Sequence, residues 1–264
     1  MGSGPIGMFD SGFGGLSVAR AVIDLLPGED IVYFGDTARY PYGPRPLEQV
    51  ADFAHEIAQH LIDTFGLGLL VVACNTASAA ALESLQADLD IPVVGVLRPG
   101  LKAALDVSRT GSVGVIGTVT TIASGAYQKE AELAGGALLV CAACPGFVEF
   151  VERGNTDSDQ VLVLAERLLA PLHEAKVDTL LLGCTHYPYL ARTIGEVMGR
   201  EVVLVSSADE TAFEVYRLLG DRSEDRQGNH TFISSGDPGW FAALGQRLLG
   251  PELSDVEKHV WGDL

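Results

Sequence analysis

Two cysteines follow apolar runs in closely matching sequence contexts. Cys74 ends the run LVVAC, and Cys184 ends the run LLLGC. Each cysteine is followed by two polar residues, which are Asn75 and Thr76 after the first and Thr185 and His186 after the second. A thiol has an ordinary pKa of about 8.5, so it can serve as a base or an acid near neutral pH. Inversion of a carbon centre by proton transfer requires one such group on each side. The pair therefore points to two-base inversion of a stereocentre.

The two cysteines also close two similar series of strand ends. The predicted strand ends of the first series are Asp10, Asp36 and Cys74, and those of the second series are Thr118, Cys144 and Cys184. The first and second members are equally far apart along the chain in both series, and the first and last members are almost equally far apart. These spacings predict two related units, in which Asp10 corresponds to Thr118 and Cys74 corresponds to Cys184.

Short apolar runs alternate with amphipathic helical stretches along the chain. The predicted strands cover residues 6–9, 31–34, 69–73, 92–96, 113–117, 137–142, 179–183, 201–205 and 231–236. Most of these runs are continuously apolar, which is typical of parallel strands covered by helices on both faces. Ligands of such sheets bind at the carboxyl ends of the strands.

We therefore expect an α/β fold with two similar doubly wound, mainly parallel domains related by pseudo-symmetry. The active site is expected in the cleft between them. The first domain is predicted to contain residues 1–97 and 209–264, because the last strand and helix are assigned to the first unit. The second domain is predicted to contain residues 98–208. Within the polar stretch at 220–230, residues 223–229 are predicted to be a surface loop.

Composition limits the possible partners and the location of the protein. The chain has 264 residues, 47% of them hydrophobic, and a formal net charge of −18. A chain with this negative charge repels phosphate backbones and anionic lipids. We therefore expect no direct nucleic-acid binding. It has no apolar run of the roughly 18–20 residues that cross a bilayer, and its start lacks the features of a signal peptide. We expect a cytoplasmic protein whose four cysteines are reduced thiols.

Other kinds of chemistry fit the sequence less well. His55 and His60 are five positions apart, about 140° around a helix, so they cannot share a metal ion in the manner of a zinc-protease motif. Cys141 and Cys144 overlap a predicted strand, where positions three apart point to opposite faces. The turn DSGFGGLS lacks the Gly-Lys ending of a phosphate loop, although its N–H groups could bind a carboxylate. Pyridoxal phosphate needs a lysine, and none of the four follows a predicted strand. We expect neither metal nor cofactor.

Six segments resemble the glutamate racemase family in order and spacing. They are FDSGFGGLSV (9–18), GDTARYPYG (35–43), ACNTAS (73–78), GVIGTVTTIAS (114–124), CPGFVEFVERG (144–154) and LGCTHYP (182–188). The resemblance extends from about residue 6 to about residue 211. It implies a cofactor-independent enzyme that interconverts L- and D-glutamate and supplies D-glutamate for peptidoglycan. It also implies a homodimer.

The same resemblance assigns roles to individual residues. Cys74 and Cys184 are implied as the two acid/base residues, with Asp10 acting on the first thiol and His186, backed by Glu152, acting on the second. A surface helix charge is the alternative for Glu152. The implied substrate-binding residues are Asp10, Ser11, Tyr42, Gly43, Asn75, Thr76, Thr118, Thr121, Thr185 and His186. One departure is Arg98, at a position where an apolar or acidic residue is expected.

Two other functions remain open at this point. A racemase for aspartate or a related amino acid would differ only in the room and the donors at the far end of the pocket. A two-domain small-molecule binding protein would share the architecture without being an enzyme. Such a binding protein has no need of paired cysteines at matched strand ends, and this counts against it.

Overall fold

The computed structural model describes residues 4–220, 226–250, 253 and 255–262. It divides the chain into two compact units, of which unit 1 contains Met1–Val96 and Ala208–Leu264 and unit 2 contains Leu97–Ser207. The predicted surface loop at 223–229 falls partly outside the described residues, because 223–225 are not among them.

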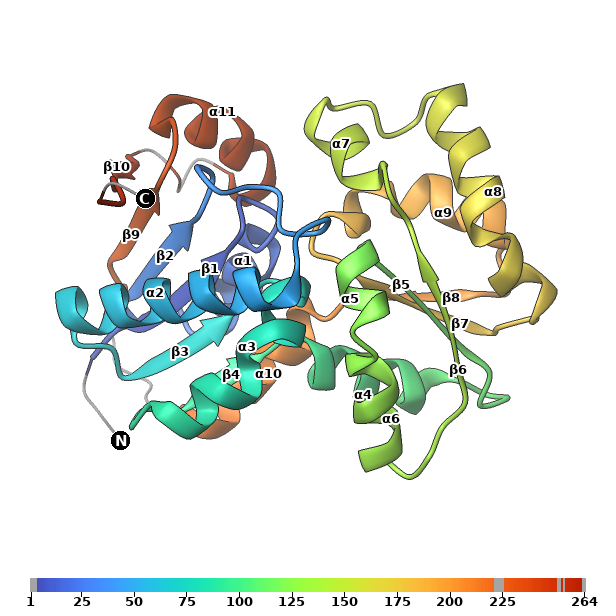
Figure 1. Ribbon diagram of the computed structural model, residues 1–264, viewed down its shortest axis with the longest axis horizontal. Coiled ribbons are helices and arrows are strands. Elements are labelled where there is room, and N and C mark those ends of the chain that lie inside the picture. Colours follow the sequence, from blue (N-terminus) through green and yellow to red (C-terminus); the bar gives the residue numbers. More distant parts are fainter. Residues whose placement is uncertain (1–3, 221–225, 251–252, 254, 263–264) are drawn as a thin grey trace. The chain divides into compact units, whose positions relative to one another are not determined.

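Unit 1 is built on a six-stranded parallel sheet (Figure 1). Its strands, in spatial order, are β10 (Glu257–Lys258), β9 (His230–Ser234), β2 (Ile31–Gly35), β1 (Ile6–Asp10), β3 (Leu69–Val72) and β4 (Val93–Gly95). Its helices are α1 (Leu16–Leu25), α2 (Leu47–Phe65), α3 (Asn75–Asp88), α10 (Ala208–Leu219) and α11 (Pro238–Leu249). The last strands and helices of the chain thus join the sheet that the first strands form.

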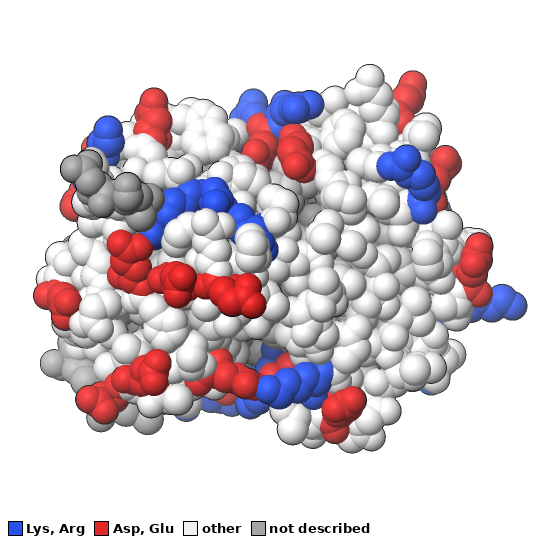
Figure 2. All heavy atoms as spheres, in the orientation of Figure 1, with Lys and Arg blue, Asp and Glu red and all other residues white. Residues whose placement is uncertain are grey.

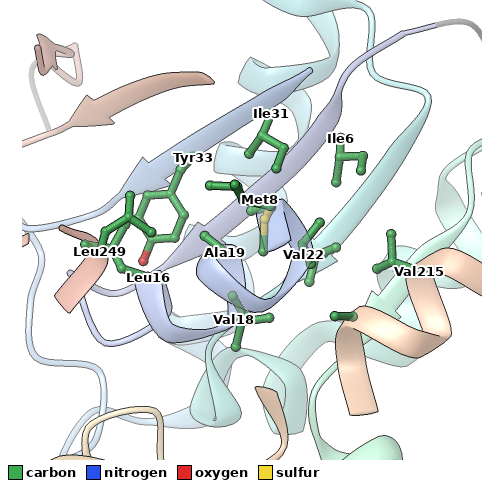
Figure 3. Packing of buried hydrophobic residues seen from close by; sticks show 14 of the residues in the cluster. Ile6, Met8, Leu16, Val18, Ala19, Val22, Ile31, Tyr33, Val215 and Leu249 are labelled. Atoms are coloured by element: carbon green, nitrogen blue, oxygen red, sulfur yellow. The ribbon is translucent and has the colours of Figure 1, made fainter. Parts of the chain in front are cut away.

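Helices cover both faces of this sheet because its strands are apolar on both sides. Met8 and Tyr33 pack on one face against α1, α10 and α11 (Figure 3). Their neighbours Phe9 and Phe34 pack on the other face against α2 and α3. The alternation follows from the period of two along a strand, and it explains why the continuously apolar runs can be recognised as buried strands.

Unit 2 contains a four-stranded parallel sheet (Figure 1). Its strands, in spatial order, are β6 (Leu139–Ala143), β5 (Val113–Gly117), β7 (Thr179–Gly183) and β8 (Val203–Val205). Its helices are α4 (Leu97–Val107), α5 (Val119–Ala123), α6 (Ala126–Leu133), α7 (Phe147–Glu152), α8 (Asp159–Glu174), the 3₁₀ helix η1 (Tyr187–Leu190) and α9 (Ala191–Met198). Leu180 and Leu182 pack in a core with α8 and α9, whereas Leu181 lies toward α4.

The two sheets share one strand order. In unit 1 the order β2-β1-β3-β4 matches the order β6-β5-β7-β8 of unit 2, and all of these pairs are parallel. The predicted internal repeat is therefore present in the topology. Phe9 pairs with Val72, and Ile116 pairs with Leu182, each partner lying two positions before its cysteine. Cys74 and Cys184 are therefore equivalent positions.

One detail of the predicted repeat is wrong by a single position. Asp10 pairs with Gly35, whereas Gly117 pairs with Ala143. Asp10 therefore corresponds to Gly117, and Thr118 corresponds to Ser11. The equal spacing of the predicted strand ends is misleading. Paired residues of the first two strands are one position closer together along the chain in unit 1 than in unit 2.

Acidic side chains are scattered over the face drawn in Figure 2, with basic ones between them. None of the helices in the described ranges is both long and apolar enough to cross a membrane.

Candidate active site

Cys74 lies at the junction of strand β3 and helix α3. It has an extended backbone and directly precedes the first residue of the helix, where it is the N-cap. The side chains of the first turn, from Asn75 to Ser78, are all buried. Backbone N–H groups of Ser11, Thr76 and Ala77 face the sulfur. A helix start leaves its first N–H groups without partners inside the helix, and here two of them serve the thiol.

The electrostatic surroundings of Cys74 favour the protonated thiol. Burial, and then the carboxylate of Asp10, raise the pKa of this thiol to about 12. The three N–H groups act in the opposite direction but are outweighed. In this state Cys74 is therefore an acid at neutral pH, and it needs an additional positive charge nearby to become a base.

Asp10 ends strand β1 and is fully buried. Its Oδ1 accepts a hydrogen bond of 2.8 Å from the N–H of Gly12. A Cβ atom at Gly15 would lie 2.7 Å from Asp10 Cβ and 2.8 Å from the hydroxyl of Tyr33. Glycine at position 15 therefore allows the chain to pass directly behind the Asp10 side chain. This close packing explains the glycine without a bound phosphate.

Tyr42 is buried, and its hydroxyl donates a short hydrogen bond to Asp36 Oδ2. Burial and the Asp36 carboxylate raise the pKa of this tyrosine well above its ordinary value, and Cys74 adds a smaller effect in the same direction. The hydroxyl of Tyr42 is thus committed to Asp36. The oxygen of Tyr42 can still accept a hydrogen bond, and the neighbouring Gly43 is partly exposed.

Cys184 has different surroundings. It follows strand β7 directly but precedes a turn and the short helix η1, so it lacks a long helix behind it. Its Sγ lies 3.9 Å from Nδ1 of His186. On the other side of the ring, Nε2 of His186 lies 3.7 Å from Oε1 of Glu152, at the end of α7. The side chains of His186 and Glu152 are 3% and 16% exposed, so this contact is shielded from water.

Burial of the His186 ring holds its pKa at about 4. The nearby carboxylate does not overcome that effect at 3.7 Å, which is beyond normal hydrogen-bond distance. The imidazole is therefore neutral at neutral pH. A neutral ring has one nitrogen that can accept a hydrogen bond and one N–H that can donate one, so it can orient the thiol of Cys184.

Thr118 and Thr121 lie at the start of helix α5. Their hydroxyls are 2.8 Å apart, and Thr118 Oγ1 also accepts the N–H of Thr121 at 3.2 Å. Thr118 is therefore the N-cap of this helix. Thr185, between Cys184 and His186, is buried.

The predicted site residues are divided between the two units. Unit 1 contains Asp10, Ser11, Tyr42, Gly43, Cys74, Asn75 and Thr76, and unit 2 contains Thr118, Thr121, Glu152, Cys184, Thr185 and His186. Arg98 belongs to unit 2, where its exposed guanidinium pairs with Glu130 at 2.8 Å. Among the described residues, no group of three or more His, Cys, Asp or Glu side chains could hold a metal ion.

A network around Asp36 is not indicated by the sequence motifs of the site. This buried carboxylate accepts hydrogen bonds from Tyr42, Arg39, Ser235 and Trp261. The sequence identifies Asp36 only as a strand end. Its position matches that of Cys144 in unit 2. The N–H of Asp36 donates to the carbonyl of Asp10, and the N–H of Cys144 donates to the carbonyl of Gly117. A buried strand-end aspartate followed by an arginine three positions later is the available signal.

Comparison with known proteins adds independent evidence. The sequence profile of the Asp/Glu/hydantoin racemase family matches residues 14–213. A glutamate racemase of Parafrankia sp. is 52% identical over 261 residues, covering 97% of this chain and 94% of that protein. The chain belongs to the Asp/Glu/hydantoin racemase family. It is accordingly a racemase, an isomerase that inverts a stereocentre.

Solved structures of the family have the same fold. The glutamate racemase isoform RacE1 of Bacillus anthracis is 41% identical, with a TM-score of 0.91 and coverage of 98% of each chain. A glutamate racemase of Francisella tularensis, crystallised in complex with D-glutamate, is 31% identical, with a TM-score of 0.88 and coverage of 98% of this chain and 97% of that one.

Proposed function

We propose that this racemase interconverts L- and D-glutamate by two-base proton transfer, with Cys74 and Cys184 as the bases and without a cofactor. The observation that carries the proposal is the equivalence of the two buried thiols, each placed directly beyond the third strand of its repeat. The substrate is inferred from the relatives, which are glutamate racemases at about half identity over nearly their full length.

The chemical step conserves all atoms and electrons. The thiolate of one cysteine removes the α-proton, so a Cα–H bond breaks and an S–H bond forms. The thiol of the other cysteine then donates its proton to the opposite face of the planar carbanion. The enzyme leaves each turnover with the two protonation states exchanged. In this proposal one thiol comes from unit 1 and the other from unit 2.

Substrate binding is expected to activate Cys74. Asp10 and burial disfavour its thiolate in the free protein. The ammonium group of an amino acid is attracted to Asp10 and cancels that repulsion, so the N–H groups of Ser11, Thr76 and Ala77 can then stabilise the thiolate. Cys184 has the neutral His186 ring at 3.9 Å, which can accept a hydrogen bond from the thiol and orient it.

The carbanion needs donors that are already oriented, because no cofactor withdraws its electrons. Polar side chains and backbone N–H groups beside the two thiols can bind the substrate carboxylates. We assign this role to Ser11, Asn75, Thr76, Thr118, Thr121 and Thr185, with the segment at Tyr42 and Gly43.

The proposal is tested with purified protein by circular dichroism, with L-glutamate and L-aspartate in parallel. We expect turnover of glutamate in both directions, little turnover of aspartate, and unchanged activity after exhaustive chelation. Faster turnover of aspartate would assign the other substrate. Binding of glutamate without turnover would contradict the proposal. Cys74→Ser and Cys184→Ser should each reduce activity by several orders of magnitude, because a hydroxyl is a poor acid and base near neutral pH.

Three further features complete the proposal. We infer that the enzyme acts in the cytoplasm, because its four cysteines are free and the mechanism needs reduced thiols. We infer that it supplies D-glutamate for peptidoglycan, so its depletion should be rescued by external D-glutamate. The family resemblance supports a homodimer, which sedimentation with and without glutamate would distinguish from a single chain of 27.9 kDa.

A further inference from the structure

The C-terminal strap, residues 257–262, lies along the edge of the unit 1 sheet. Its strand β10 pairs with β9, and the N–H of His259 donates to the carbonyl of Ser234 at 2.9 Å. Beyond this pairing, Trp261 packs partly buried against the core under helix α2, with its ring centroid 5.4 Å from that of Phe34. The strap thus brings a residue near the chain end to the carboxyl end of strand β2.

Trp261 reaches the buried carboxylate of Asp36. The indole Nε1–H donates to Oδ1 of Asp36 at 2.9 Å, and the hydroxyl of Ser235 donates to the same oxygen at 2.7 Å. Oδ2 accepts from Arg39 Nε at 2.7 Å and from the hydroxyl of Tyr42. A carboxylate has about four lone-pair sites. All four sites of the Asp36 carboxylate are therefore used. Each donor restricts the orientation of this carboxylate, which accepts the hydrogen bond from Tyr42.

Trp261 also holds the second partner of this network. The guanidinium of Arg39 lies between two rings, 4.2 Å from the centroid of Phe53 and 4.0 Å from that of Trp261. Arg39 is buried, and it forms an ion pair with Glu56 on α2 as well as with Asp36. One indole thus fixes both charged groups at the start of the segment that leads to Tyr42.

We propose that Trp261 is a positioning residue for the racemase reaction. It holds Asp36 and Arg39, and through them Tyr42 and the segment that ends at Gly43, in the conformation that receives the substrate. The inference rests on the proposed function, in which this segment contacts glutamate. The chemistry at the two thiols does not involve the strap, so Trp261 should affect substrate binding more than the proton transfers.

Trp261→Phe is the most informative variant, because it keeps an aromatic ring beside Arg39 and removes the N–H donor to Asp36. Ser235→Ala removes the other donor to the same oxygen and serves as the second variant if the first does not fold. Trp240→Phe is the matched control. Trp240 belongs to the same unit and is 42% exposed, and its ring packs edge-on against Phe13 at 5.2 Å.

Three quantities are measured for each variant: kcat and KM for both enantiomers, the glutamate concentration that half-protects Cys74 from alkylation, and Tm. For Trp261→Phe we expect KM and the half-protecting concentration to rise about tenfold, as for loss of one hydrogen bond to a charged group. We expect kcat to fall less than about threefold, and Trp240→Phe to leave all kinetic values near those of the wild type.

A merely structural role would lower Tm and leave KM and the half-protecting concentration unchanged, and this result would overturn the proposal. A loss of kcat of about tenfold, without a change in KM, would also overturn the proposal. Failure of the proposed function is separate, because it would appear as absent glutamate turnover in the wild-type protein itself.

Discussion

The Sγ atom of Cys184 lies 3.9 Å from Nδ1 of His186, whose opposite nitrogen lies 3.7 Å from Glu152. Cys74 has no such imidazole in its described surroundings, and backbone N–H groups at the start of α3 face its sulfur instead. Equivalent positions in the repeat therefore have different surroundings. The one-sided placement of His186 leads to the first two predictions.

His186→Asn should reduce kcat/KM by about 100-fold, because the shorter amide side chain cannot keep the contacts of the ring with both Cys184 and Glu152. The rate of racemisation is measured by circular dichroism in both directions. His173→Asn is the control, since His173 is an exposed residue of the same unit. Near-normal activity of His186→Asn would show that Cys184 is activated without the ring.

The buried His186 ring should also make stability depend on pH. Its pKa is lowered from 6.5 to about 4 in the folded protein, so the unfolded chain binds the proton more readily between these values. Stability from this residue is complete above about pH 6.5 and is lost as the pH falls toward 4. The loss is on the order of a few kcal/mol.

This loss is measured as the change in the free energy of unfolding between pH 7 and pH 4.5, in the wild type and in His186→Asn. The variant should lose less stability on acidification. Partial burial lowers the pKa of His60 and His259 in the same direction, so only the difference between the two proteins is informative. Equal losses would mean that His186 is not kept neutral by burial.

Alkylation of Cys74 in the free protein should accelerate up to strongly alkaline pH. Only the thiolate reacts, and burial together with Asp10 raises the pKa of this thiol to about 12. The site-specific rate is followed by mass spectrometry, which separates Cys74 from the half-buried Cys141. A rate that levels off below about pH 8.5 would indicate a thiolate stabilised in the free protein and would contradict this prediction.

Gly15→Ala should impair the enzyme through Asp10. The new methyl group would lie 2.7 Å from Asp10 Cβ and 3.0 Å from Ala73 Cβ, so the aspartate must shift. We expect a loss of about 1–3 kcal/mol in the free energy of unfolding and a larger relative loss of activity. Gly195→Ala is the control, because its methyl group would meet only ordinary contacts at 3.7 Å in helix α9. An active Gly15→Ala variant would show that Asp10 need not be held so closely.

Much of the fold can be predicted because the strands are continuously apolar. The predicted strands at 113–117 and 179–183 have the bounds that the structure shows. Strand β10 is not predictable in this way, because Glu257 and Lys258 are exposed and charged and pair with only one neighbouring strand. The predicted strand at 137–142 is shifted to 139–143, since its first residues are exposed or only partly buried.

The site can be predicted only where sequence neighbours act together. Cys184, Thr185 and His186 are consecutive, and their motif indicates that they belong together. The contact between Trp261 and Asp36 joins residues 225 positions apart, and no local pattern indicates it. The hydroxyl of Tyr42 is another example, because its partner Asp36 is determined by the path of the chain between them.

The most direct test of the two-base mechanism is the origin of the α-hydrogen in the product. Unlabelled L- or D-glutamate is converted in heavy water, and the early product is examined by mass spectrometry. The donor thiol is not the base that removed the substrate proton, and it has already exchanged with solvent. We expect early product from both enantiomers to carry deuterium at Cα while the remaining substrate carries none. Early product that retains the original hydrogen would contradict two opposed bases and indicate that one base serves both faces.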